Sequence, residues 1–101
     1  MTHATLKTAV LVALSERGIM AWNNPTGVAI PLGSTAPVRY GLTGAPDVIG
    51  ILPGGRFLAV EVKVGRDRVR PEQERWHARA RELGALVIVL RETDELSDML
   101  A

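Results

Sequence analysis

Residues 57–64 (FLAVEVKV) alternate between two sides of an extended chain, which indicates a β-strand. Both sides are mainly apolar, so we predict a central strand that is covered on both faces. Glu61 and Lys63 are the exceptions, and they share one face. Ionised groups in a dry environment are destabilising by several kcal/mol unless something compensates them. The pattern therefore predicts a buried polar site on an otherwise apolar sheet.

The hydrophobic pattern also predicts the other elements of an α/β fold. They are a helix over 4–16, strands over 19–22, 47–52 and 85–90, a helix from Pro71 to Gly84 and a short last helix near Asp94. Residues 28–43 are rich in Gly and Pro and are expected to form a loop. Strand 85–90 follows strand 57–64 through a helix, so the two should be parallel. We thus predict an αβββαβ core, with a central mixed sheet flanked by helices.

The second predicted helix brings a further polar group to the sheet. Gln73, Trp76, Ala80 and Leu83 recur at helical spacing and are expected to face the strands, whereas His77 is expected at the surface. Gln73 is the polar member of the packing face. It should approach the carboxyl end of strand 57–64. Four polar side chains are therefore predicted to converge: Asp47, Glu61, Lys63 and Gln73.

The turn between strands 47–52 and 57–64 decides whether the two carboxylates can meet. A regular two-residue turn at Gly54-Gly55 would leave Asp47 and Glu61 on opposite faces of the sheet. A three-residue loop that pairs Leu52 with Arg56 would place them opposite each other on one face. A bulge within either strand would have the same effect. We predict an odd loop or a bulge.

Composition and charge narrow the class of protein. The 101 residues are expected to form a single domain (1–101), and the chain has no cysteine, so a metal would need oxygen or imidazole ligands. We find no apolar run of membrane-spanning length and no signal peptide, which favours a cytoplasmic protein. Residues 56–81 carry eight basic and four acidic side chains. This segment either binds a polyanion or is a solvated helix face.

The polar positions carry a resemblance to a known family. Pro46-Asp47, then Glu61-Val62-Lys63, and Gln73 stand in "GAPDVIG…GRFLAVEVKVG…RPEQERWHARARELGALVIVL". This pattern resembles the VRR-NUC branch of the PD-(D/E)XK nuclease superfamily, in its small stand-alone phage and prophage form. The resemblance implies a restriction-endonuclease-like fold and hydrolysis of DNA phosphodiester bonds by a Mg²⁺- or Mn²⁺-dependent endonuclease.

The resemblance also assigns roles to individual residues. Asp47, Glu61 and the backbone carbonyl of Val62 would hold the cation, because hard divalent ions prefer oxygen ligands. Lys63 would orient the attacking water and offset negative charge beside the scissile phosphate. Gln73 would position a water or the nucleic-acid backbone.

The remaining inferences concern partners and one mismatch with the family. Binding of DNA is expected at the basic residues beside the site: Arg66, Arg68, Arg70 and Arg75. The family's resolvase-like members imply a homodimer and branched DNA as an alternative to simple cleavage. A glutamate usual in the first helix is missing, and the position falls near His3, which is either a substitute ligand or, as we expect, a disordered terminal residue. This mismatch keeps a second function open, a catalytically impaired nucleic-acid-binding module.

Overall fold

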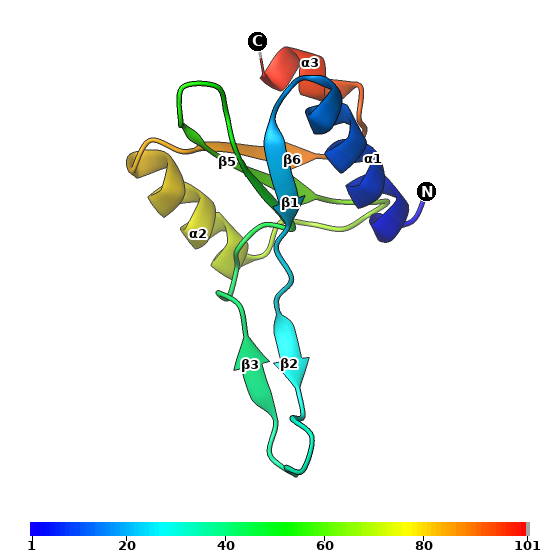
Figure 1. Ribbon diagram of the computed structural model, residues 1–101, viewed down its shortest axis with the longest axis vertical. Helices are drawn as coiled ribbons and strands as arrows, with labels where there is room; N and C mark the ends of the chain where they lie inside the picture. The colour runs from blue at the N-terminus through cyan, green and yellow to red at the C-terminus, as the bar shows by residue number, and fades with distance from the viewer. Residues whose placement is uncertain (101) are drawn as a thin grey trace.

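The computed structural model describes residues 1–100, which form a mixed α/β fold with a projecting arm (Figure 1). The elements are α1 (His3–Glu16), β1 (Met20–Asn23), β2 (Gly27–Ala29), β3 (Val38–Tyr40), β4 (Val48–Ile51), β5 (Phe57–Val62), α2 (Pro71–Glu82), β6 (Leu86–Leu90) and α3 (Glu95–Met99). Thr2 caps α1 by accepting a hydrogen bond from the Thr5 backbone N–H. Pro71 opens α2 at its first turn. No helix among the described residues is long and apolar enough to cross a membrane.

Four strands form the central sheet in the order β1-β4-β5-β6. The pairs β1–β4 and β4–β5 are antiparallel, whereas β5 and β6 are parallel. The sheet is therefore mixed, and leaving out β2, β3 and the short last helix gives the predicted αβββαβ order. Strand β5 lies in the interior of the sheet between β4 and β6, as its apolar faces indicated.

Helices cover the two faces of the sheet unequally. On one face, the apolar stripe of α1 (Leu6, Val10, Leu14) joins even-numbered residues of β5 and residues of β6 and α3 in the main core. On the other face, Ala59, Ala85 and Val87 form a smaller cluster against α2, with Trp76 and Ala80 partly buried beside it. Glu61 follows Ala59 on this second face because side chains alternate along a strand. The polar site thus lies under α2, where the apolar core is thin.

The prediction of a loop over 28–43 is wrong for two short segments. Strands β2 and β3 pair antiparallel and form a separate two-stranded sheet. Each has only three residues, too few to produce a visible alternation in the sequence. Residues 24–43, which we call the arm, project away from the body along the long axis of the molecule, whose extents are 47 × 32 × 26 Å (Figure 1). The arm is inserted between β1 and β4, next to Asp47.

The predicted packing face of α2 is only partly correct. Gln73 is buried and Ala80 and Trp76 are partly buried, but Leu83 is 71% exposed and lies at the C-cap, where the helix ends. His77 is 3% exposed and belongs to the buried stripe, so its expected place at the surface is wrong. The stripe that faces the sheet runs through Gln73, His77 and Ala80, which are four and three residues apart. A hydropathy pattern assigns histidine to solvent and therefore misplaces the helix face.

Candidate active site

The β4–β5 hairpin places two carboxylates on one face of the sheet. Val48 pairs with Val60 and Ile51 with Phe57, and the Leu52 backbone N–H donates to the Arg56 carbonyl at 2.9 Å. The loop between the strands therefore contains three residues, as predicted. Continuing the same register one step beyond Val48 sets Asp47 opposite Glu61. The first geometric requirement for a shared cation is met.

Asp47 is fixed by contacts on both of its sides. Its Oδ2 atom accepts a hydrogen bond from the Val62 backbone N–H at 2.9 Å. The Asp47 carbonyl accepts from the Asn24 backbone N–H at 2.8 Å, and Asn24 Nδ2 donates to the Pro46 carbonyl at 3.1 Å. The hydrophobic pattern alone assigns no role to Asn24. Its position directly after a strand aimed at the site was the only signal of this role.

Glu61 is a buried carboxyl group in a strongly perturbing environment. It is 2% exposed, and its pKa is raised to about 8. Burial is the largest cause, followed by a hydrogen bond with Asp47 and the negative charge of Asp47, while Lys63 and Arg70 act in the opposite direction. A buried carboxyl group perturbed by a second carboxyl group beside it is a candidate site for binding a cation.

Lys63 and Gln73 contact each other beside the carboxylates. Lys63 Nζ donates to Gln73 Oε1 at 2.9 Å, and the Arg70 backbone N–H donates to the same oxygen at 2.9 Å. Gln73 thus caps the start of α2 and anchors the lysine at the same time. The predicted convergence of Gln73 with Lys63 is confirmed. The hydrogen bonds of the Gln73 side chain go to the lysine and to the backbone at the helix start. Its role in positioning water or nucleic acid stays a prediction.

His3 lies at the site, so its expected disorder is wrong. It is the first residue of α1, and His3 Nε2 lies 3.4 Å from Asp47 Oδ2. Its side chain is 41% exposed and faces the same polar cavity as Asp47. The cap at Thr2 explains this order, because it lies one residue before the histidine and so starts the helix at His3. Threonine is a favoured N-cap residue, so Thr2 is the signal that could have predicted this order.

Of the predicted DNA-binding residues, Arg68 and Arg70 line the polar cavity, whereas Arg66 and Arg75 are exposed and do not. Arg91 was not predicted, and it holds the loop before α2: its guanidinium donates to the carbonyls of Gly65 at 3.2 Å and Asp67 at 2.6 Å. These contacts tie the loop before α2 to the end of β6.

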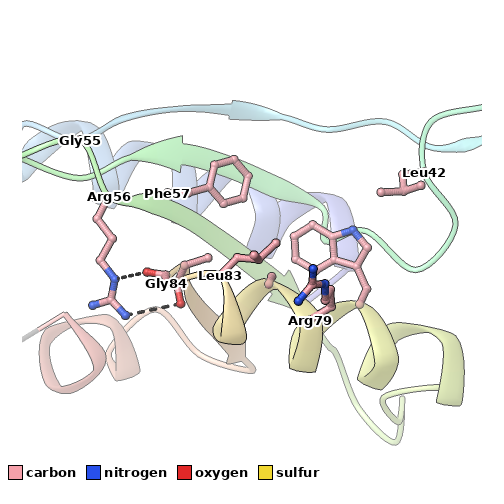
Figure 2. A pocket seen from close by; sticks show the side chains of 10 residues that line it. Leu42, Gly55, Arg56, Phe57, Arg79, Leu83 and Gly84 are labelled. Carbon is pink, nitrogen blue, oxygen red and sulfur yellow. Dashed lines mark hydrogen bonds between the residues drawn. The ribbon is translucent and has the colours of Figure 1, made fainter.

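Two cavities flank α2, and their chemistry differs. The larger, about 630 Å³, is lined mainly by apolar side chains and two arginines and contains no carboxylate (Figure 2). Arg56 closes one end by donating to the carbonyls of Gly84 and Ala85, at 2.7 and 3.4 Å (Figure 2). The smaller, about 250 Å³, is lined by polar groups: His3, Asp47, Glu61, Val62, Lys63, Asp67, Arg68, Arg70 and Gln73. The smaller cavity is the candidate site.

The donor set of this cavity fits a hard divalent cation. Among the described residues, no three His, Cys, Asp or Glu side chains form a group that could hold a metal alone. Asp47 and Glu61 supply carboxylate oxygens, and the Val62 carbonyl and water are oxygen donors that could complete the shell, as Mg²⁺ sites commonly require. Glu61 Oε1 is also buried without a hydrogen-bond partner. The pair of carboxylates beside a lysine suits chemistry on a negatively charged phosphate.

Comparisons with known proteins agree with this geometry. The model of the VRR-NUC domain family matches residues 32–94, which include Asp47, Glu61, Lys63 and Gln73. Over 63 residues the chain is 42% identical to "Putative nuclease p44" of Acyrthosiphon pisum secondary endosymbiont phage 1, covering 62% of this chain and 67% of that protein. A solved VRR-NUC domain shares the fold, with a TM-score of 0.69 at 24% identity over 97% of this chain and 92% of the other.

Proposed function

This chain belongs to the VRR-NUC domain family, and from that premise we propose that it is a metal-dependent nuclease that hydrolyses phosphodiester bonds of DNA. The observation that carries the proposal is the meeting of Asp47, Glu61 and Lys63 in one polar cavity. A carboxylate pair under a helix is a destabilising arrangement that a bound cation would compensate. The name of the phage relative supports the same activity.

The proposed division of labour follows from the contacts of each group. Asp47, Glu61 and the Val62 carbonyl would hold Mg²⁺ or Mn²⁺. When bound, such an ion supplies charge neutralisation at the phosphate and an acidified water. Lys63 donates one N–H to Gln73, so its two other N–H groups are available to a phosphate oxygen or to the attacking water. Gln73 holds that ammonium group in place.

The direct test is cleavage of labelled DNA by the purified protein. Linear, flapped and four-way DNA are incubated with Mg²⁺, with Mn²⁺ or with EDTA, and the products are resolved by size. We expect cleavage with either metal and none with EDTA. Preference for the four-way substrate would support a junction-resolving enzyme, the finer form of the proposal.

A catalytically impaired DNA-binding module is the second candidate function. The observation in its favour is His3, which lies beside Asp47 near the place where relatives carry a glutamate. In that case the protein would bind the same DNA but leave it intact with every metal. The two candidates are therefore separated by cleavage, since both predict binding.

DNA contact is proposed at the basic loop before α2. Replacing Arg68 by alanine should weaken DNA binding and reduce the slope of log affinity against log salt by about one, because one phosphate contact is lost. Arg79→Ala is the matched control, since Arg79 is also exposed but lies by the apolar cavity. Affinity is measured by fluorescence anisotropy over a salt series. Equal slopes for Arg68→Ala and wild type would exclude the contact.

We further propose a homodimer in which the arm contacts a second copy of the chain. Its large exposed apolar side chains are Val28, Ile30, Leu32, Val38, Tyr40 and Leu42. Arg39 is the only charged residue of 24–43, so the arm is poorly suited to phosphate binding. An isolated two-stranded hairpin is marginally stable in water, which favours a protein surface as its support. The apolar cavity of the same fold offers such a surface on a second copy.

Leu32→Asp is expected to weaken the dimer by about tenfold or more, because a charge would enter an apolar contact. Leu32 is fully exposed in the single chain, so the fold itself should be unaffected. Val12→Asp is the matched control, since Val12 is an exposed apolar residue of α1 far from the arm in sequence. Sedimentation velocity measures the dissociation. A wild-type protein that sediments as a monomer would contradict the proposal.

A further inference from the structure

Two buried polar atoms face each other beneath α2 without a hydrogen-bond partner. Within residues 1–100, the buried side-chain nitrogen and oxygen atoms left without a partner are His77 Nε2 and Glu61 Oε1. They lie 3.7 Å apart, and their side chains are 4% and 3% exposed. An N–H···O bond requires about 2.7–3.2 Å, so neither atom satisfies the other at this distance.

The fold alone does not account for a histidine at this position. His77 occupies the middle of the stripe that faces the sheet, between Gln73 and Ala80. An apolar side chain would pack there without a penalty, whereas a buried polar group without a partner costs about 1–3 kcal/mol. An imidazole ring carries at least one N–H donor whether it is neutral or protonated. Placed on Nε2, that donor faces Glu61 Oε1, which lies 3.7 Å away.

We infer that His77 is a positioning residue for the metal ligand Glu61. Its Nε2–H donates to Glu61 Oε1 once the carboxylate moves closer by less than about 1 Å. This bond satisfies both atoms and leaves the second oxygen of Glu61 for a cation shared with Asp47, which lies opposite Glu61 in the register of the hairpin. Ligating carboxylates are commonly held in this way, and loss of such a partner weakens metal binding by about 10- to 100-fold. The inference rests on the proposed metal-dependent function.

The test compares Mn²⁺ binding with the stability of the metal-free protein. His77→Leu removes the donor and keeps an apolar filling, and His77→Met is the alternative if the leucine variant does not fold. We expect either variant to bind Mn²⁺ about 10- to 100-fold more weakly, measured by titration calorimetry. In EDTA the melting temperature should stay equal or rise, because a buried unpaired group is gone. His77→Gln keeps a donor and should recover most of the affinity.

The outcomes separate this inference from the proposed function. If wild type binds Mn²⁺ and the His77 variants bind it equally well, His77 is a packing residue and the inference is overturned. If the variants lose stability in EDTA in parallel with affinity, and His77→Gln restores neither, the role is structural and the inference is also overturned. If wild type itself binds no Mn²⁺, the proposed function fails first, and the inference fails with it.

Discussion

Replacing Glu61 by glutamine is expected to lower the rate of DNA cleavage by about 10³-fold or more while the protein stays folded. The variant loses a negatively charged oxygen ligand. Of the two carboxylates that would hold the cation, only Asp47 then remains. Its fold should survive because the pKa of Glu61, raised to about 8, keeps the metal-free carboxyl protonated near neutral pH. Glutamine is a neutral group of nearly the same shape. Single-turnover cleavage and thermal unfolding in EDTA measure the two effects.

Glu74→Gln is the matched control for this experiment. Glu74 is an exposed residue of α2, so the same chemical change is made in the helix that covers the site but outside the polar cavity. Its cleavage rate should equal that of wild type. Near-normal cleavage by Glu61→Gln would remove Glu61 from the catalytic site. A loss of activity that merely follows a loss of folded protein would do the same.

The order of helices and strands could be predicted because the hydrophobic periodicity of each main element is strong. Apolar residues alternate along the whole of strand β5. If Asp47 and Glu61 share one face of the sheet, their positions decide whether the loop between their strands has an odd or an even number of residues. Only a loop of odd length, or a bulge, lets two carboxylates meet. The three-residue loop follows from that condition, although Gly54-Gly55 by itself would favour a two-residue turn. Here a chemical requirement predicted the backbone geometry.

What could not be predicted depends on contacts between distant segments. Helix α2 turns His77 toward the sheet, where it lies 3.7 Å from the carboxyl group of Glu61, and a hydropathy pattern cannot register such a neighbour. His3 reaches the site because a cap at Thr2 starts α1 at that residue. Asn24 supports Asp47 through backbone atoms, which carry no sequence signature. Each missed residue lies beside a partner at least sixteen positions away in the sequence.

The strands of the arm could not be predicted from the hydrophobic pattern either. Strands β2 and β3 are stabilised by pairing with each other, and they contribute nothing to the core clusters. Gly44 at its base has φ +84°, and a Cβ there would lie 2.4 Å from the Glu72 carbonyl oxygen. The chain therefore needs glycine to pass the start of α2 on its way to Asp47. Gly44 therefore lets one short segment of backbone connect the arm to Asp47 at the site.

The stability of the metal-free protein is expected to fall as pH rises from 6.5 to 8. Glu61 has a folded-state pKa of about 8 against an ordinary value of 4.5, so the folded state holds a proton that the unfolded state releases. The stabilisation is complete below pH 4.5 and is lost as pH rises through 8. The slope is about 1.4 kcal/mol per pH unit. The lowered pKa of His77 changes the stability below pH 6.5 and does not contribute to the fall between pH 6.5 and 8.

Saturating Mn²⁺ should abolish this fall, because a cation between Asp47 and Glu61 takes the place of the proton and binds more tightly as pH rises. Urea unfolding at several pH values, with EDTA or with Mn²⁺, measures both curves. Glu61→Gln is the control, since it has no proton to lose and its metal-free stability should be flat over the same range. If the fall persists in Glu61→Gln, it comes from another group. If Mn²⁺ leaves the wild-type curve unchanged, the carboxylate pair holds no cation, and the buried charge of this site must serve another purpose.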